Sequence, residues 1–230
     1  MKDNLGKRMK ENYEDRFRYY LPRRAYTIIR VDGKAFHTLT RMMHKPFDND
    51  FIGCMNWAAQ TLLHEIEGAQ CAYVQSDEIS IVVTDFAKLE TQAWFDNNLQ
   101  KMCSVSASIA TAAFNEALAA TQYNCYYGVF DSRVFQIPYR TEVFNYLIWR
   151  QKDAIRNSIQ SVAQANFSNK ELNKKNTKEQ IKMLLEKDVS WEALAPYLKY
   201  GRLFVPGNCY SIVFQEDLEF LKDTIPDNSL

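Results

Sequence analysis

Three carboxylates, Asp32, Asp77 and Glu78, are the residues of this chain whose type and spacing best suit chemistry. Asp32 closes the apolar run AYTIIRVD, and Asp77-Glu78 separates the two apolar runs of AYVQSDEISIVV. Carboxylates that converge repel one another unless a cation lies between them, and a site of oxygen ligands selects Mg²⁺. Two such ions form a clamp for in-line displacement at phosphorus. The three acids therefore predict a magnesium-dependent phosphoryl-transfer site if they meet, and a solvated hairpin tip if they do not.

The elements that position these acids follow from periodicity. Four short segments are apolar and rich in β-branched or aromatic residues, which predicts strands. They are residues 25–31, 69–75, 78–86 and 127–138. Helices are predicted over 50–67, from helical spacing of its apolar residues, and over roughly 88–120, which contains neither Pro nor Gly. The order is that of the ferredoxin-like βαββαβ pattern, an α+β fold in which the first strand neighbours the central hairpin. We therefore expect the three acids to meet.

The same arrangement recurs in the palm domains of polymerases and nucleotide cyclases, a comparison at the level of the fold. We expect residues 1–138 to form a palm-like catalytic core that includes a basic N-terminal segment. After Pro138 we predict one helix over 141–167, a polar break at 168–178, a short helix and a last apolar run. Residues 139–230 are thus expected to form a helical C-terminal part packed on the core.

A second group of residues suits phosphate. In VDGKAFH, Gly33 lets the backbone pass close to a ligand, and the N–H groups from Gly33 to His37 are predicted to form a nest or a helix N-terminus for a triphosphate. Lys45 and Lys101 are candidate phosphate partners, although a single Lys is more often a surface charge. The chain has neither GxxxxGK[ST] nor GxGxxG, and its three histidines lack the spacing of a zinc or hydrolase site.

Charge and composition limit the setting. The formal net charge is zero, but within residues 1–24 Lys and Arg outnumber Asp and Glu by eight to four. That excess suits either an arm that faces a polyanion or a solvated amphipathic helix. Five cysteines without a CxxC pair indicate a reducing compartment. The polar N-terminus and the absence of a run as long as a membrane span predict a soluble, cytoplasmic protein with no membrane partner.

Five motifs occur in order between residues 25 and 160: RVDGKAFH, KPFD, YVQSDEIS, FDSRVFQIP and YLIWRQKDA. Each is weak alone, but the ordered set resembles the tRNA-histidine guanylyltransferase-like family of reverse, 3′-to-5′ nucleotide polymerases. The resemblance implies a palm-like fold, two Mg²⁺ ions, GTP and ATP as substrates, and nucleotide addition to the 5′ end of tRNA. A homo-oligomer, with a tetramer as one form, is also expected.

The resemblance implies roles for individual residues. Asp32, Asp77 and the Gly33 carbonyl would bind metal, and Glu78 would be an acidic partner of that catalytic site. The residues expected to bind the nucleotide, including the two candidate lysines, are Asp32, Gly33, Lys34, Ala35, Phe36, His37, Lys45, Ser76, Asp77 and Lys101. The residues expected to contact RNA are Arg16, Arg18, Arg23, Arg24, Arg150 and Asn157.

One position departs from the family. Enzymes dedicated to tRNA-histidine carry His-Ile-Asn-Asn-Leu-Tyr-Asn after the WRQ stretch, whereas this chain has AIRNSIQ, with Ala154 in place of the His. The chain therefore resembles more closely the branch that repairs truncated tRNA 5′ ends against a template strand. A dedicated guanylyltransferase, a non-catalytic RNA-binding palm and a nucleotide cyclase remain the alternatives.

Overall fold

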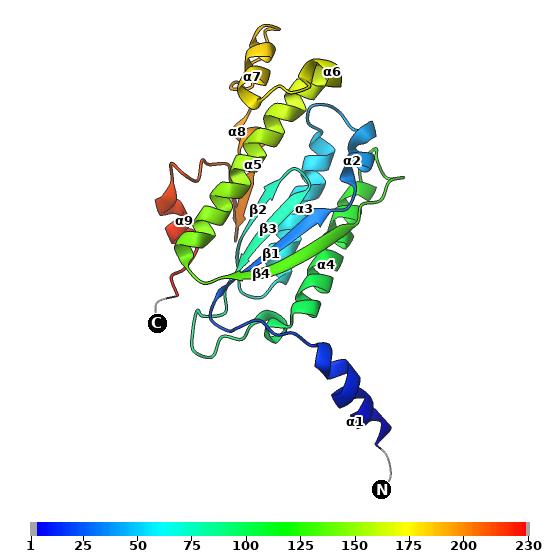
Figure 1. The fold of residues 1–230 in the computed structure, drawn as a ribbon, viewed down its shortest axis with the longest axis vertical. Coiled ribbons are helices and arrows are strands. Elements are labelled where there is room, and N and C mark those ends of the chain that lie inside the picture. Colours follow the sequence, from blue (N-terminus) through cyan, green and yellow to red (C-terminus); the bar gives the residue numbers. More distant parts are fainter. Residues whose placement is uncertain (1–3, 229–230) are drawn as a thin grey trace.

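An antiparallel sheet with helices on both faces forms the centre of the fold in the computed structural model, which describes residues 4–228 (Figure 1). The strands are β1 (Tyr26–Gly33), β2 (Ala69–Gln75), β3 (Glu78–Val83), β4 (Phe130–Ile137), β5 (Arg202–Val205) and β6 (Asn208–Tyr210). The helices are α1 (Leu5–Met9), α2 (Phe36–Leu39), α3 (Asn49–Glu65), α4 (Leu99–Ala119), α5 (Arg140–Asn166), α6 (Asn169–Leu172), α7 (Thr177–Leu185), α8 (Pro196–Lys199) and α9 (Leu218–Thr224). Shorter helical turns are η1 (Lys10–Glu14), η2 (Asp15–Phe17), η3 (Thr40–Met42) and η4 (Trp94–Asn97).

The strand order confirms the α+β, ferredoxin-like prediction. The strands described between residues 4 and 228 lie in the order β4-β1-β3-β2-β5-β6, and the first four of these are the βαββαβ core. β1 is central and pairs antiparallel with both β3 and β4. In this register Asp32 lies opposite Glu78 on β3 and opposite Asp131 on β4. The topology thus brings acidic residues from three strands to one end of the sheet.

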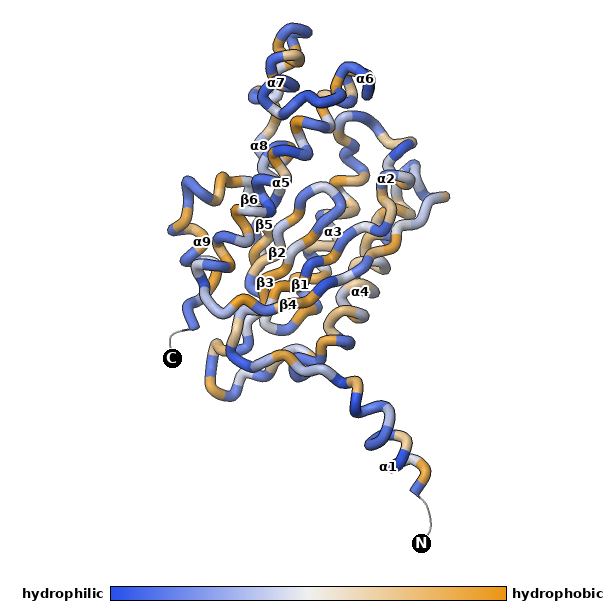
Figure 2. The backbone as a smooth tube through the Cα atoms, in the orientation of Figure 1, coloured by the Kyte–Doolittle hydropathy of each residue, from blue (hydrophilic) through white to orange (hydrophobic). Residues whose placement is uncertain are grey.

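Alternation along the strands divides the interior into two cores. Ile29 and Val31 of β1 pack with residues of α3 and α4, whereas Ile28 packs on the other face with residues of α5. Figure 1 shows α5 crossing one face of the sheet, with α3 and α4 behind it. Figure 2 shows the hydrophobic stretches gathered along the central strands, while the region of α6 and α7 is mostly hydrophilic. Because β1 is buried on both faces, the residues before Asp32 are mostly apolar and do not alternate between polar and apolar.

The helix predicted over 88–120 begins only at Leu99, so its first third was wrong. Phe95, Asp96 and Asn97 have left-handed backbone conformations, and the Asn98 side chain caps α4 by accepting a hydrogen bond from the Lys101 N–H. Asn and Asp tolerate left-handed backbone and favour caps over helix interiors, so the sequence FDNN stops the helix from extending further back.

The C-terminal part is helical only in part. The helix expected over 141–167 is present as α5, but β5 then pairs with β2, and β6 with β5. The last apolar run therefore extends the core sheet. The predicted break at 168–178 contains α6 and the start of α7, each begun by a capping box. The division of the chain near residue 138 stays a prediction.

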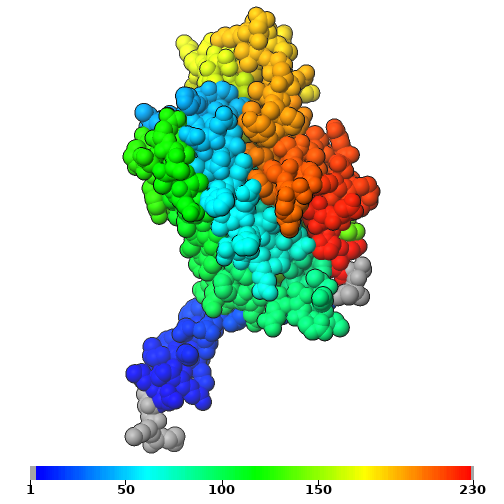
Figure 3. Space-filling view, turned by 180° about the vertical axis from the view of Figure 1, so that it is seen from behind, coloured from blue at the N-terminus to red at the C-terminus, as the bar shows by residue number. Residues whose placement is uncertain are grey.

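Residues 5–17, which we call the N-terminal arm, project away from the body (Figures 1 and 3). The arm contains α1, η1 and η2 and has no buried residue. Residues 1–3 of the basic segment lie outside the described residues. Of the helices described between residues 4 and 228, none is both long and apolar enough to cross a membrane.

Candidate active site

Asp32 and Asp77 meet where the first strand ends beside the tip of the central hairpin. Asp32 is the penultimate residue of β1, and Asp77 lies in the turn between β2 and β3. The Gly33 N–H donates to the Asp77 carbonyl at 3.0 Å, which ties the end of β1 to that turn. The predicted convergence of these carboxylates is therefore a property of the sheet register, and not of loop conformation alone.

Both carboxylates are half-buried, and the pKa of each is raised. Burial raises the pKa of Asp32, and the nearby charge of Asp131 raises it further. Burial also raises the pKa of Asp77, and the charges of Asp32 and Glu78 act in the same direction. Neither Asp32 nor Asp77 forms an ion pair with any residue between 4 and 228. The site therefore has the electrostatic character of a place for a cation.

The structure corrects the role predicted for Glu78. Its carboxylate is buried and accepts two hydrogen bonds from Arg150 of α5, from Nε and from Nη2, each at 2.7 Å. Such a bidentate pair uses both oxygens, so Glu78 is not free to bind metal. Glu78 instead anchors the base of the hairpin tip to α5. Strand alternation makes this possible, because Glu78 follows Asp77 directly and faces α5 with Ser80.

The carboxylates that remain without an ion pair, Asp32 and Asp77, fit Mg²⁺. Among residues 4–228, no group of three or more His, Cys, Asp or Glu side chains is placed to hold a metal ion. Two carboxylates remain, and Mg²⁺ is commonly bound by one or two carboxylates while substrate phosphates and water complete its shell. The donors are hard oxygens without sulfur or imidazole, which argues against zinc or copper. The chain thus suits a metal ion that arrives with a nucleotide.

The raised pKa of Asp32 predicts how stability depends on pH without metal. The folded protein keeps the proton of Asp32 to a higher pH than the unfolded chain does. Its stabilising effect is complete below the ordinary Asp pKa, about 4, and is lost as the pH rises through the raised value. We therefore expect Asp32→Asn to melt at a higher temperature than wild type at pH 7, with the difference vanishing below about pH 4.

Thermal melts in the presence of a chelator, taken across that pH range, measure this difference. Addition of Mg²⁺ should stabilise the wild type more than the variant, because only the wild type keeps both carboxylates. A variant that melts below the wild type at pH 7 without metal would show that Asp32 contributes to the fold, contrary to this expectation.

The predicted phosphate cradle is shorter than expected. The N–H groups of Gly33 and Lys34 donate to the carbonyls of Asp77 and Val129, so they are not available to a ligand. Ala35 has a left-handed backbone, with φ of 56°, and α2 begins at Phe36. The N–H groups of Phe36 and His37 lie in its first turn, where a helix provides no acceptor. The cradle is thus reduced to Ala35, Phe36 and His37.

Gly33 is required at its position for a steric reason. A Cβ atom there would lie 2.5 Å from Cγ of the buried Phe36 ring. The absence of a side chain lets Phe36 fold back over the end of β1 and places α2 beside the two carboxylates.

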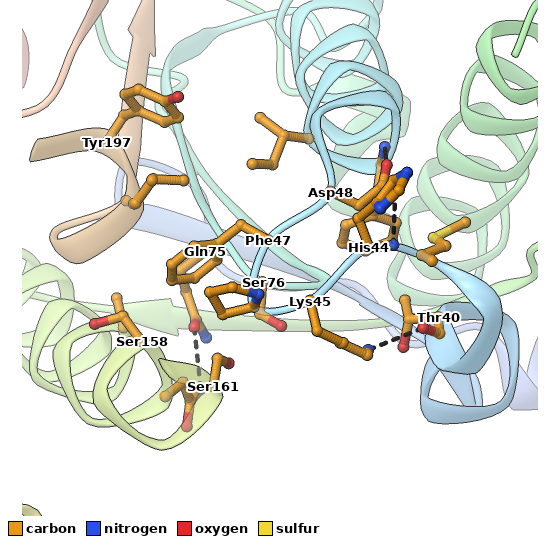
Figure 4. Close-up of a pocket in the computed structure, with 18 of the residues that line it drawn as sticks. Thr40, His44, Lys45, Phe47, Asp48, Gln75, Ser76, Ser158, Ser161 and Tyr197 are labelled. Atoms are coloured by element: carbon orange, nitrogen blue, oxygen red, sulfur yellow. Dashed lines mark hydrogen bonds between the residues drawn. The ribbon is translucent and has the colours of Figure 1, made fainter. Parts of the chain in front are cut away.

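The two candidate lysines lie at different places. Lys45 is exposed, and its Nζ donates to the Thr40 carbonyl at 2.9 Å (Figure 4). It lines the same cavity as Ser76, next to Asp77. Lys101, by contrast, lies in the first turn of α4 beside Phe95, at the end of the sheet where Tyr20 bridges Asn98. β1 runs from that end toward Asp32, so the structure does not bring Lys101 to the carboxylates of its own chain, and its role stays a prediction.

A cavity of about 180 Å³ lies beside the hairpin tip, and we call it the hairpin-tip cavity. It is enclosed by the segment before α3, by Gln75 and Ser76, by α5 and by the segment from Tyr197 to Arg202. Figure 4 shows Phe47 and Gln75 between the segment before α3 and the α5 residues Ser158 and Ser161. Ala154, the position singled out in the sequence, also lines this cavity.

The residues predicted to contact RNA are not equivalent. Arg16 is exposed on the N-terminal arm, whereas Arg18 pairs there with Glu14 and Asp15. Arg23 donates to Asp85 at 2.6 Å, and Nη2 of Arg24 is buried without a partner. For Arg23 and Arg24 these contacts favour a role in the fold over one in RNA binding.

Arg150 and Asn157 are also engaged within the protein. Arg150 is buried and pairs with Glu78 and Asp153, which corrects its prediction as an RNA contact. Asn157 lines the hairpin-tip cavity and donates to Gln75 at 3.3 Å. Asn157 therefore faces this cavity and is not part of an exposed surface for RNA.

Sequence reasoning missed the basic and acidic residues around Asp32. Arg30 on β1 lies opposite Arg133 on β4, and Asp32 lies opposite Asp131. Nε of Arg30 is buried without a hydrogen-bond partner. The sequence did contain a signal for this arrangement. Residues two apart on a strand share a face, so Asp131 and Arg133 of β4 lie on one face, as Arg30 and Asp32 of β1 do. Antiparallel pairing then sets the two acids opposite each other and the two arginines opposite each other.

Comparisons with known proteins agree with this geometry. The family model described as tRNAHis guanylyltransferase matches residues 6–138. A probable tRNA(His) guanylyltransferase of Drosophila melanogaster is 32% identical over 148 residues, which cover 60% of this chain and 48% of that protein. The tRNA(His) guanylyltransferase of Schizosaccharomyces pombe is 29% identical over 143 residues, 58% of this chain and 51% of that protein. The chain spans about half the length of the curated relatives it matches.

A solved structure matches over nearly the whole chain. A bacterial tRNA(His) guanylyltransferase-like protein in complex with ATP has a TM-score of 0.92 and 41% identity, covering 96% of this chain and 99% of that one. The guanylyltransferase of Saccharomyces cerevisiae, at 21% identity and a TM-score of 0.75 over 90% of this chain and 99% of that one, supports the fold alone. The family model covers more than half of the chain, and it includes β1 with Asp32, β3 with Glu78 and the turn with Asp77. The chain therefore belongs to the tRNAHis guanylyltransferase family.

Proposed function

We propose that this chain is a Mg²⁺-dependent nucleotidyltransferase that adds nucleotides in the 3′-to-5′ direction to the 5′ end of tRNA. The observation that carries the proposal is the pair of half-buried, unpaired carboxylates, Asp32 and Asp77, beside the first turn of α2. Family membership supports it. So do the related bacterial structures, one in complex with ATP and one in complex with GTP.

The reaction joins an incoming nucleotide to the tRNA through one new phosphate ester. The 3′-hydroxyl of the nucleotide attacks the 5′ phosphorus of the tRNA, and AMP or pyrophosphate leaves, depending on whether ATP has first activated a 5′-monophosphate or a triphosphate is already present. Mg²⁺ would stabilise the charge that develops on the attacking and leaving oxygens. The protein contributes chiefly by positioning the reactants.

Different residues of the chain would bind the metal ions, bind the phosphates and position the hairpin tip. Asp32 and Asp77 would hold the metal ions, and the N–H groups of Ala35, Phe36 and His37 would bind phosphate oxygens. Lys45 and Ser76 lie on the adjoining cavity, where they can contact the same nucleotide. The buried Arg150–Glu78 pair keeps the hairpin tip at a fixed distance from α5. Asp32 is thus held by a strand, and the turn that carries Asp77 is anchored to a long helix through Glu78, which positions both carboxylates.

We further propose template-directed repair of 5′ ends over addition of one G to tRNA-histidine. Ala154 occupies the wall of the hairpin-tip cavity where dedicated enzymes carry a His. A methyl group neither donates nor accepts hydrogen bonds, so any selection that depends on an imidazole contact is missing. Pairing with the opposite strand of the acceptor stem then selects the nucleotide at the transfer step, whatever the affinity of the tRNA-free enzyme for each nucleotide.

We expect a 5′-truncated tRNA to be extended at least about tenfold faster with the complementary nucleotide than with the others, since one base-pair step contributes about 1.4 kcal/mol. Incorporation of labelled nucleotides into truncated tRNAs of several identities, compared with full-length tRNA-histidine, measures this. Extension of tRNA-histidine alone would favour the dedicated enzyme. Release of a small cyclic product would favour a cyclase, and binding without incorporation a non-catalytic palm.

Two further expectations have partial support. The cysteines are all free thiols, two of them exposed, which suits a reducing compartment such as the cytoplasm. The N-terminal arm carries exposed apolar residues four apart, Leu5, Met9, Tyr13 and Phe17, which suit contact with a second copy in the expected homo-oligomer.

A further inference from the structure

Arg202 is a buried cation without an acidic partner. It is the first residue of β5 and lies opposite Val74 of β2 in the sheet. Only 7% of its surface is exposed, and burial lowers its pKa to about 10. Its Nε donates to Oδ1 of Asn56 at 2.5 Å, and the Arg202 side chain makes no other hydrogen bond and no ion pair with the described residues. A buried charge is normally paired, and this guanidinium has no acidic partner among the described residues.

The free side of Arg202 lines the hairpin-tip cavity. The one carboxylate on the cavity wall, Asp48, accepts hydrogen bonds from the N–H groups of His44 and Phe51 and from the Tyr123 hydroxyl, so it is fully engaged. The neighbouring polar side chains, Gln75 and Asn157, are neutral amides. The two Nη groups of Arg202 are thus hydrogen-bond donors that no residue of the described chain satisfies.

The walls of the cavity suit a flat ring better than a phosphate. Apolar and aromatic residues line it, among them Met43, Phe47, Phe51 and Ile52. The groups suited to phosphate, which are the two unpaired carboxylates and the first turn of α2, adjoin the cavity, because Ser76 on its wall precedes Asp77 and Thr40 on its wall directly follows α2. With its phosphates at those groups, a nucleotide has only its base left to enter the hairpin-tip cavity.

We infer that Arg202 is the residue that makes this cavity prefer guanine, by donating to the O6 and N7 edge of the base. The inference rests on the proposed function, because it takes the ligand to be a nucleotide held at Asp32 and Asp77. Guanine presents two adjacent acceptors on that edge, which match the fork of an arginine. Adenine presents N7 beside a 6-amino donor, which opposes a second Nη–H group. This contact leaves N1 and the 2-amino group of guanine open to pairing with a template.

Nucleotide analogues test the inference on the unmodified protein. Equilibrium binding without tRNA should show GTP bound about tenfold or more tightly than ATP, because a bidentate Arg–guanine contact discriminates by roughly that factor. Inosine triphosphate, which keeps O6 and N7 but lacks the 2-amino group, should bind as GTP does, whereas 7-deaza-GTP should bind several-fold more weakly. Equal binding of all four nucleotides would overturn the inference, and this series needs no variant to fold.

Substitution then assigns the preference to Arg202. Arg202→Met should lower GTP affinity to the level of ATP while changing ATP affinity little, and Arg202→Lys, with a compact ammonium in place of a planar fork, should retain only part of the preference. Arg156→Met, which removes an exposed guanidinium from α5, is the matched control and should change neither. Equal losses for GTP and ATP would show a phosphate contact, and an unchanged preference would place the base elsewhere. If the unmodified protein extends no tRNA yet keeps this Arg202-dependent preference, the proposed function fails and the inference stands.

Discussion

Asp77→Asn should lower nucleotide transfer at least about 100-fold while leaving the protein folded. Loss of a partner that merely orients a metal ligand costs roughly 10–100-fold, and loss of a ligand itself should cost more. The fold should survive because Asp77 forms no ion pair in the described chain, and because burial with like charges raises its pKa. Asp32→Asn should behave in the same way.

Single-turnover incorporation of labelled nucleotide into a truncated tRNA, with thermal melts of each variant, measures both parts of this expectation. Asp188→Asn is the matched control, because Asp188 is exposed and lies between α7 and α8, far along the chain from the site. The shared metal site would be excluded by an Asp77 variant with near-normal transfer. A variant that melts well below the wild type would instead give Asp77 a structural role.

Arg150→Met should be the most destabilising of these substitutions, by about 3–5 kcal/mol. Arg150 and Glu78 each expose 7% of their side chains, and removal of the guanidinium leaves the Glu78 carboxylate buried without a counter-charge. For a chain of this size such a loss corresponds to a fall in melting temperature on the order of 10 °C.

A second variant separates lost charge balance from lost packing. Glu78→Leu combined with Arg150→Met removes both charges and should recover most of the stability, because a buried ion pair contributes little beyond the desolvation that it offsets. Arg156→Met is the control on the same helix: Arg156 is 55% exposed in its pair with Asp153, and this pair should contribute less than about 1 kcal/mol. Chemical denaturation of the single, double and control variants measures all three values. A single variant as stable as the control would contradict the anchoring role of Arg150.

The amino-acid sequence by itself determined the order of the elements and the meeting of Asp32 with Asp77. Strand and helix periods are local properties, and the βαββαβ order leaves few ways to arrange four strands, so β1 must lie beside the hairpin. Because Asp32 and Asp77 stand at the ends of these strands, their convergence followed from the order alone.

Tertiary structure alone decided which charges are free. Glu78 and Asp77 are adjacent, yet one is neutralised by Arg150, 72 residues away, and the other is not. Lys101 has the side chain of a phosphate ligand but lies at the wrong end of α4. Arg202 is an ordinary cation in the sequence, and only the pairing of β5 with β2 buries it without a carboxylate. Whether a charge is paired or buried depends on contacts between residues distant in the chain, and local patterns carry no information about those contacts.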